Sequence, residues 1–205
     1  MLAAIGDVMR ELHSRGWITT RDGNVSFRYR GENLLYVTPS GCRKYQIYPD
    51  NLVVATFARD DQELLIPEGV KPSGELHMHH LLQVRAPETR AVVHAHPTYT
   101  VAAMYRGFSL PCLCQQFPEI HRYTRVGPTV PAIPAVTREL GEATAQAFGI
   151  NGGGSLRCDI VGQAQHGVTA VAFDPWAAFE HIERLEHICQ IVLASGVTPD
   201  KVYRA

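Results

Sequence analysis

Two histidines in one apolar run constrain the fold of this chain more than any other feature. The run AVVHAH, residues 91–96, is short and apolar and therefore predicts a buried strand. Residues i and i+2 of a strand point to the same face, so His94 and His96 would look the same way, with Cα atoms roughly 6.5 Å apart. Two imidazoles placed in this way either bind one metal ion, with Zn–N bonds of about 2.0–2.1 Å, or lie on the wet face of a sheet.

A catalytic zinc needs a third protein ligand and one open position. His166 is the best candidate, because it precedes Gly167 at the expected end of a strand, where the backbone can turn sharply. Other histidines have unsuitable spacings for a shared ion. Three of them fall on one short helix without sharing a face, and we interpret them as surface or half-buried residues: His77, His79 and His80.

Composition restricts the kind of protein. With 205 residues, of which 45% are hydrophobic and 19% charged, the chain is expected to form a single domain over residues 1–205. Nineteen basic and twenty acidic residues give a formal charge of −1, so nothing favours nucleic acid or a membrane surface as partner. No apolar run approaches membrane-spanning length. The five cysteines are odd in number and scattered, which indicates reduced thiols and a cytoplasmic protein.

Strands and helices are expected in alternating groups. The first helix should end near Gly16, and strands are predicted at 24–29, 33–38, 51–57 and 91–96. Helices are predicted after Ser73, which we expect to cap the first turn containing Glu75, and at 97–107, 137–149 and 174–196. Two further strands should flank His166, and the glycine-rich segment 151–157 is interpreted as a flexible loop. This order indicates a layered α/β or α+β domain.

Five segments carry a resemblance that spans most of the chain. They are GNVSFRY, VTPSG, KPSGELHMHHLLQVRAPETRAVVHAH, TRELGEATAQAFG and QHGVTAV, in this order. Together they resemble the class II aldolase/adducin family, most closely its zinc-dependent sugar-phosphate aldolases of the fuculose-1-phosphate type. The resemblance implies an α/β/α sandwich around a mainly antiparallel sheet, and a homotetramer with active sites between subunits.

The same resemblance assigns roles to residues. It makes His94, His96 and His166 ligands of Zn²⁺ or another divalent ion, and Glu75 the catalytic acid/base. It surrounds the phosphate of a sugar-phosphate substrate with four residues: Asn24, Ser40, Gly41 and Ser73. The implied reaction is cleavage of a ketose 1-phosphate to dihydroxyacetone phosphate and a small aldehyde through a metal-stabilised enediolate.

The residue types agree with this chemistry independently. Three neutral imidazoles leave the charge of a divalent ion uncompensated, which suits a Lewis acid, and a nearby carboxylate can move a proton at carbon. Two Pro-Ser-Gly segments, 39–41 and 72–74, each place a hydroxyl beside a glycine N–H and are candidate anion cradles. The competing interpretation is two Pro-Gly turns.

Departures from the family pattern concern the substrate. Gly74 stands where the aldolases often have a second serine, and a tyrosine that acts across the subunit interface falls at Gln115. Tyr99, Tyr123 and Arg125 are the candidates to replace it.

Three interpretations therefore compete at the level of sequence. The first is the aldolase. The second is a dehydratase, decarboxylase or 4-epimerase on a related sugar phosphate, although the epimerases usually have aspartate at the position of Glu75. The third is a non-catalytic adducin-like interaction module, which has no need of three converging imidazoles beside a carboxylate.

Overall fold

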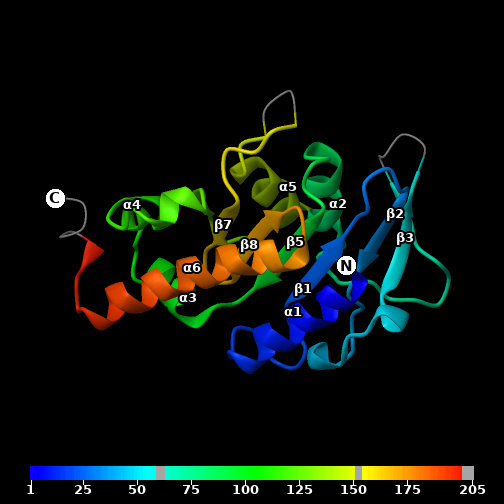
Figure 1. Ribbon diagram of the computed structural model, residues 1–205, viewed down its shortest axis with the longest axis horizontal. Coiled ribbons are helices and arrows are strands. Elements are labelled where there is room, and N and C mark those ends of the chain that lie inside the picture. Colours follow the sequence, from blue (N-terminus) through cyan, green and yellow to red (C-terminus); the bar gives the residue numbers. More distant parts are fainter. Residues whose placement is uncertain (59–62, 151–153, 200–205) are drawn as a thin grey trace.

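In the described part of the chain, an eight-stranded sheet lies between two layers of helices (Figure 1), which is the α/β/α sandwich implied by the family resemblance. The computed structural model describes residues 1–58, 63–150 and 154–199. Part of the predicted glycine-rich loop, 151–153, falls outside these ranges. None of the described helices is both long enough and apolar enough to cross a membrane.

The sheet is built from short strands in the spatial order β4-β3-β2-β1-β5-β8-β7-β6. Neighbouring strands are antiparallel except for β6 and β7, which are parallel. This confirms the mainly antiparallel sheet. The strand bounds are β1 Asn24–Phe27, β2 Leu34–Val37, β3 Val53–Phe57, β4 Leu64–Leu65, β5 Ala91–Ala95, β6 Val126–Val130, β7 Ile160–Gln163 and β8 Gly167–Ala172.

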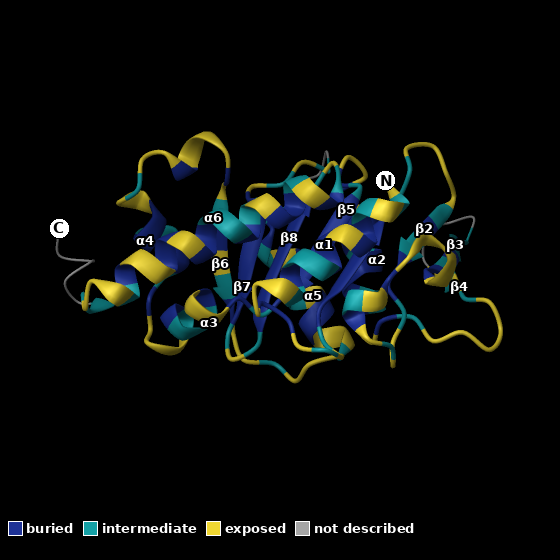
Figure 2. Cartoon of the chain, turned by 60° about the horizontal axis from the view of Figure 1, so that its bottom comes forward, coloured by how far each residue is buried: buried dark blue, intermediate teal, exposed yellow. Residues whose placement is uncertain are grey.

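One face of the sheet is covered by α1 (Leu2–Ser14) and α6 (Pro175–Ala194), with α3 (Thr98–Tyr105) packed against α6. Their apolar sides meet β1, β5 and β8 in the largest core cluster, which is fully enclosed at Leu12, Val93 and Ile182. Figure 2 shows the strands as a buried layer beneath these helices. Removing this apolar surface from water stabilises the layer by about 25 cal/mol per Å².

The opposite face is covered by α2 (Leu76–Arg85) and α5 (Arg138–Ala147), which pack against each other. Met78 and Leu82 from α2 and Phe148 after α5 meet Val92 of β5 in a second core cluster. The strands in the middle of the sheet are therefore buried on both faces, which explains why their sequence is continuously apolar.

Local signals fix the helix ends largely as predicted. The Asp174 carboxylate accepts a hydrogen bond from the Ala177 N–H, and Pro175 occupies the first turn of α6. Gly16, Gly149 and Gly196 follow helices with φ between 63° and 71°, a left-handed conformation that glycine adopts without strain.

Several elements were not predicted. They include α4 (Leu110–Gln115), the three 3₁₀ turns η1 Lys44–Gln46, η2 Pro49–Asn51 and η3 Ile120–Arg122, and the strands β4 and β6. Each is too short to show a period, and β6 contains Gly127 and Pro128, which are unfavourable in a central strand and tolerated at a sheet edge. The predicted strand 91–96 is one residue too long, because β5 ends at Ala95.

Candidate active site

The three predicted metal ligands lie together. His94, His96 and His166 each offer a ligand atom, and these atoms all lie within 4.8 Å of one another. Nε2 of His94 is 2.9 Å from Nε2 of His96, and the centroids of the His94 and His166 rings are 4.7 Å apart. A tetrahedral ion with Zn–N bonds of about 2.0–2.1 Å needs ligand nitrogens roughly 3.3 Å apart, so this cluster has the dimensions of a three-histidine metal site.

Two neighbouring strands bring the histidines together. His94 lies on β5, directly opposite Thr169 of β8, and His166 occupies the turn that leads into β8. Gln165 has a φ of 58°, an uncommon conformation for a residue other than glycine. Gly167 is required by close packing, because a Cβ there would lie 2.4 Å from the Ala95 carbonyl oxygen. This tight turn directs His166 towards β5.

The environment keeps His94 neutral. Burial lowers the pKa of His94 well below its usual range, and the neighbouring imidazoles of His96 and His166 lower it further. A hydrogen bond to the backbone of Val168 acts in the opposite direction. A neutral imidazole with one nitrogen committed to the protein presents its other nitrogen as a metal ligand.

His96 has a carboxylate partner on its outer side. Its Nδ1 lies 3.6 Å from Oδ2 of Asp22, which is itself held by the N–H and hydroxyl of Thr19. Burial lowers the pKa of His96, and Asp22 opposes this shift. Carboxylate partners of this kind orient metal-binding histidines. Sequence analysis did not identify Asp22, which lies far before His96 in the chain with no motif linking the two.

Two polar atoms at the cluster are unsatisfied by the protein. Nδ1 of His166 and Oε1 of Glu75 are buried and make no hydrogen bond among the described residues. Buried polar groups without a partner are rare in folded proteins and mark places where an ion, water or substrate binds. The donor set therefore fits a divalent metal ion.

Glu75 lies at the centre of this arrangement. Its Oε2 is 3.3 Å from His94 Nε2, and its Oε1 is 3.7 Å from His166 Nε2. Glu75 occupies the N-cap position of α2 and is nearly enclosed, with 9% of its surface exposed. The prediction that Ser73 caps α2 is wrong. The helix has no side-chain cap, and the Ser73 hydroxyl instead accepts a hydrogen bond from the Glu75 N–H at 3.3 Å.

Three of the four predicted phosphate residues, Asn24, Ser40 and Ser73, line one cavity with Glu75, whereas Gly41 is not part of its lining. This cavity has a volume of about 410 Å³, and its walls include Asn24, Ser40, Ser73, Glu75, His96 and His166. The two Pro-Ser-Gly segments are bound side by side, because the Ser40 N–H donates to the Lys71 carbonyl and the Ser73 N–H to the Thr38 carbonyl. Their assignment to phosphate stays a prediction.

The structure adds two basic residues to this cavity that sequence analysis missed. Lys44 is only 3% exposed and donates from Nζ to the Pro39 carbonyl at 2.7 Å. Burial lowers its pKa. Arg21, an exposed residue, donates to the Gly41 carbonyl. The cavity therefore carries positive charge beside the hydroxyl groups of Ser40 and Ser73.

The interpretation of the helix histidines was wrong for His79 and His80. His79 is completely buried, and both of its ring nitrogens are hydrogen bonded, to Ser26 and to Asn24. His80 is buried against the ring of Phe57. Only His77 is half-buried as expected. The three side chains do point in different directions, which agrees with the prediction that they share no face.

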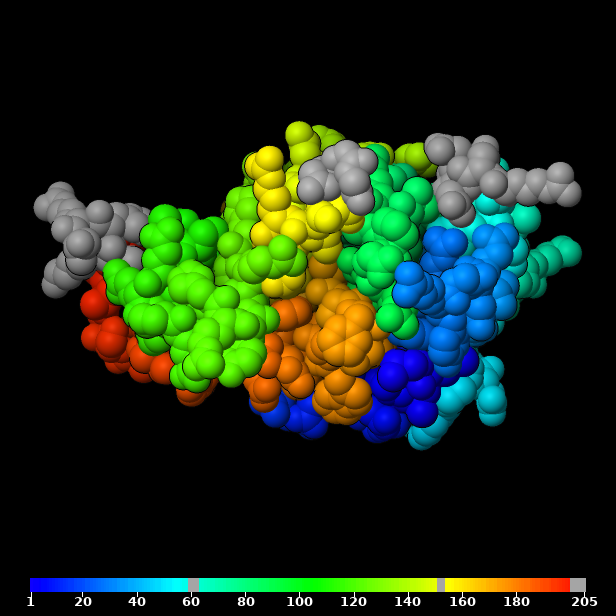
Figure 3. Space-filling view, turned by 45° about the horizontal axis from the view of Figure 1, so that its top comes forward, coloured from blue at the N-terminus to red at the C-terminus, as the bar shows by residue number. Residues whose placement is uncertain are grey.

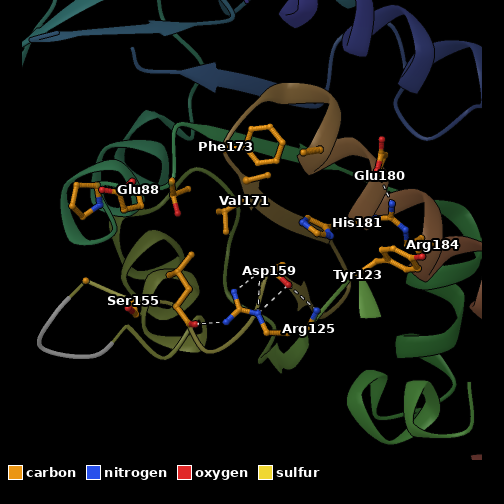
Figure 4. Close-up of a pocket in the computed structure, with 16 residues that line it drawn as sticks. Glu88, Tyr123, Arg125, Ser155, Asp159, Val171, Phe173, Glu180, His181 and Arg184 are labelled. Carbon is orange, nitrogen blue, oxygen red and sulfur yellow. Dashed lines mark hydrogen bonds and ion pairs between the residues drawn. The ribbon is translucent and has the colours of Figure 1, made fainter. Parts of the chain in front are cut away.

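A larger cavity of about 630 Å³ lies elsewhere, where segments 154–159 and 171–184 approach Tyr123 and Arg125. Figure 3 shows this face of the molecule, with segment 173–184 in orange. In Figure 4 the basic side chains of the cavity point to carboxylates: Arg125 binds Asp159, and Arg184 binds Glu180. The metal-binding cluster found among the described residues, His94, His96 and His166, does not line this cavity. Tyr123 and Arg125 thus lie outside the cavity of about 410 Å³ that is lined by His96 and His166, here called the histidine cavity, and Tyr99 does not line it either.

Comparison with known proteins identifies the family. The Class II Aldolase and Adducin N-terminal domain family matches residues 3–193. The chain belongs to this family. A similar curated protein is the 5-deoxy-D-ribulose 1-phosphate aldolase of Bacillus thuringiensis serovar kurstaki, 28% identical over 182 residues, which span 89% of this chain and 79% of that protein.

Other family members catalyse different reactions. The 3-oxo-tetronate 4-phosphate decarboxylase of Haemophilus influenzae is 28% identical over 197 residues, which span 89% of this chain and 81% of that enzyme. Shorter matches, which span 42% and 45% of their relatives' own length, are to proteins named as a probable methylthioribulose-1-phosphate dehydratase and an L-ribulose-5-phosphate 4-epimerase. Membership alone therefore identifies a sugar-phosphate enzyme superfamily and leaves the reaction open.

Solved structures have the same fold. The l-fuculose-1-phosphate aldolase from Thermus thermophilus superposes with a TM-score of 0.74 at 27% identity, covering 95% of this chain and 93% of that chain. The α/β sandwich predicted from the sequence is thus the fold of a class II aldolase.

Proposed function

We propose that this protein is a metal-dependent aldolase that cleaves a ketose 1-phosphate to dihydroxyacetone phosphate and a small aldehyde. The observation that carries the proposal is the position of Glu75, whose carboxylate lies within 3.7 Å of two of the three clustered histidines and which lines the same cavity as Ser40 and Ser73 of the Pro-Ser-Gly segments. A carboxylate between a metal site and a phosphate site lies beside the substrate carbons that connect the phosphate to the oxygens at the metal. It can therefore exchange a proton with one of these carbons.

The protein's own residues have separate tasks in this reaction. His94, His96 and His166 would hold the divalent ion, most simply zinc, which supplies Lewis acidity to the oxygens next to the reacting bond. Glu75 exchanges a proton with substrate carbon as general acid and base. Ser40, Gly41, Ser73 and Asn24, assisted by Lys44, bind the phosphate and thereby set which carbon faces Glu75.

The phosphate pocket uses neutral donors and one buried cation. The hydroxyl groups of Ser40 and Ser73 would provide short hydrogen bonds to the phosphate, and the N–H of Gly41, which follows Ser40 and has a φ of 74°, would add another. Lys44 keeps two of its three N–H donors beyond the one given to Pro39. An ammonium held in a low-dielectric wall attracts a phosphate more strongly than one in water.

We also infer that the enzyme works as a homotetramer with active sites between subunits. Within one chain, neither Tyr99 nor Tyr123 lines the histidine cavity, and Gln115 replaces the tyrosine of the aldolase pattern. A second protonating group would then come from a neighbouring subunit. Light scattering on the purified protein measures the assembly, and a monomer with full activity would contradict this inference.

The decisive experiment is hydrogen exchange on one substrate. The zinc-loaded protein is incubated with dihydroxyacetone phosphate in D₂O, and NMR follows replacement of a hydroxymethyl proton by deuterium without an aldehyde. We expect exchange, and new ketose phosphates when lactaldehyde or glycolaldehyde is added. Glu75→Gln is the control, since it preserves shape and removes the base.

Other outcomes identify the other family reactions. Release of carbon dioxide from a sugar-acid phosphate would indicate the decarboxylase, loss of water the dehydratase, and interconversion of two pentose phosphates the 4-epimerase. Neither exchange nor carbon–carbon bond formation with any aldehyde would refute the aldolase. A protein that binds no metal would favour the non-catalytic adducin-like module.

A further inference from the structure

A series of buried, hydrogen-bonded side chains ends at Glu75. The Ser26 hydroxyl is 2.7 Å from Nδ1 of His79, Nε2 of His79 is hydrogen bonded to Oδ1 of Asn24, and Nδ2 of Asn24 is 2.8 Å from Oε2 of Glu75. Ser26 and Asn24 are on β1, and His79 is on the adjacent helix α2. All four side chains are almost completely removed from solvent.

The hydrogen bond between Asn24 and Glu75 determines which group donates and which accepts throughout this series. An ionised carboxylate only accepts hydrogen bonds, so Asn24 must present its NH₂ group to Glu75 and its oxygen to His79. Nε2 of His79 then carries the proton, and Nδ1 is an acceptor for the hydroxyl of Ser26. The imidazole is therefore neutral, in agreement with burial, which lowers the pKa of His79 to about 3.

This hydrogen-bonded series gives the two carboxylate oxygens of Glu75 different partners. Oε2 accepts from Asn24 and lies 3.3 Å from His94 Nε2, whereas Oε1 has no hydrogen-bond partner among the described residues and lies 3.7 Å from His166 Nε2. Lys44, Asp22 and Arg21 are further charged residues in the lining of the same cavity. One oxygen is thus held by the protein, and the other is left for another partner.

We propose that His79 is a positioning residue: it locks the Asn24 amide so that this amide holds Oε2 of Glu75 and leaves Oε1 to exchange protons with the substrate. The catalytic part rests on the proposed function, whereas the order of the hydrogen bonds does not. Without His79, the Asn24 oxygen loses its donor, and the bond to Glu75 alone is left to hold the amide, so Oε2 is held less firmly. Asn24 still has a second N–H for a substrate oxygen, so this role and its predicted phosphate contact are compatible.

The hydrogen-bond order is tested without substrate. Nitrogen-15 NMR of the histidine rings in the metal-free protein identifies which nitrogen of His79 is protonated. We expect the neutral Nε2–H form throughout pH 6–8, and a shift in the tautomer ratio in Ser26→Ala, which removes the donor to Nδ1 and little else. An Nδ1–H form or a charged ring in the parent protein would overturn the proposal.

The positioning role is tested by kinetics on matched variants of α2. His79→Leu removes both ring nitrogens, while His79→Gln keeps a donor at the position of Nε2. Gln83→Leu is the control, because Gln83 lies one turn further along the helix, is equally buried, and donates to the Arg90 carbonyl instead of Asn24. Outer partners of active-site groups typically contribute about 10–100-fold.

We expect kcat of His79→Leu to fall about 10–100-fold with KM and metal content within about twofold of the parent, most of the loss to be recovered in His79→Gln, and Gln83→Leu to keep parental kcat. Equal kcat in His79→Leu and Gln83→Leu would overturn the positioning role. If His79→Leu does not fold, Ser26→Ala and His79→Gln carry the test through tautomer and kcat together. A parent protein with an Nε2–H ring but no exchange chemistry would refute the proposed function and leave the hydrogen-bond order standing.

Discussion

Gly74 and Val136 contact each other at the wall of the candidate active-site cavity, so a side chain at position 74 would force Val136 to shift. A Cβ on Gly74 would lie 2.7 Å from Cγ1 and 3.3 Å from Cγ2 of Val136. Val136 itself has a φ of 66°, a left-handed conformation that is strained for a β-branched residue. Such strain costs about 1–3 kcal/mol and gathers at functional sites, and here it falls on a residue in the wall of the cavity.

This contact predicts that the missing serine hydroxyl cannot simply be restored. Gly74→Ser should reduce the affinity for dihydroxyacetone phosphate and destabilise the fold by about 1–3 kcal/mol, as overpacked sites do. Gly74→Ser combined with Val136→Gly removes both the contact and the strained φ, and should bind the phosphate at least as tightly as the parent. Calorimetry and urea unfolding measure the two effects. A single Gly74→Ser variant with parental stability would show that Val136 moves aside at no cost.

Metal content should depend on the three clustered histidines. We expect about one divalent ion per chain in the parent and loss of that ion in His94→Ala, because two imidazoles leave an open and weak site. His181→Ala is the matched control, since this partly buried histidine binds Thr124 away from the cluster. Elemental analysis measures the metal content. If the single variants at 94, 96 and 166 all retain full metal, the three histidines do not form the metal site.

Metal removal should also lower stability. An ion that binds only the folded chain contributes about 2.7 kcal/mol when present at about 100 times its Kd. The melting temperature should therefore fall on chelation in the parent and change little in His94→Ala. An equal response in both proteins would mean that the ion binds elsewhere.

Glu75→Gln should keep the metal and the fold and lose turnover by about 10²–10⁴-fold. The amide has the shape of the carboxylate and can accept from Asn24, but it cannot exchange a proton at neutral pH. Turnover and metal content are measured on the same preparation. A loss below about tenfold would make Glu75 a positioning group.

Sequence reasoning predicted the cluster of His94, His96 and His166 because its signals are local or strongly patterned. Alternation along 91–96 put His94 and His96 on one face, and a glycine marked the turn at His166. The order of the five family segments predicted the sandwich, including the arrangement of helices on both faces, which short-range periodicity does not specify.

The residues that were missed depend on partners far away in the chain. His79 is buried because β1 places Ser26 and Asn24 against it, from a segment much earlier in the sequence. Lys44 begins the 3₁₀ turn η1 and is buried with its Nζ bonded to the Pro39 carbonyl, although lysines are almost never buried unless paired. Nothing in the flanking residues of either position distinguishes it from a surface residue.

Lys44 gives a prediction for substrate binding. Lys44→Met keeps the length of the side chain and removes its charge, so affinity for dihydroxyacetone phosphate should fall by about 10-fold or more, since a hydrogen bond to a charged group is worth about 1.5–3 kcal/mol. Affinity for unphosphorylated dihydroxyacetone should be unaffected. Arg43→Met, on the neighbouring residue outside the cavity lining, is the control. Equal losses for both ligands would place Lys44 outside the phosphate pocket.

The buried histidines predict an acid-sensitive fold. The pKa of His79 is lowered to about 3 and that of His94 is also well below its usual range, whereas both have a pKa near 6.5 in an unfolded chain. Below about pH 6.5 the unfolded chain therefore takes up protons that the folded chain does not. The contribution of these histidines to the free energy of unfolding is fully present above this pH and is lost as the pH decreases. Each group contributes a slope of up to about 1.4 kcal/mol per pH unit.

Urea unfolding of the metal-free protein from pH 7.5 to pH 5 measures the slope, and His79→Gln should reduce it by one such contribution because other titrating groups cancel in the difference. Parallel curves for the two proteins would mean that His79 becomes protonated in the folded state, contrary to its burial and to the hydrogen bonds that it makes with Ser26 and Asn24.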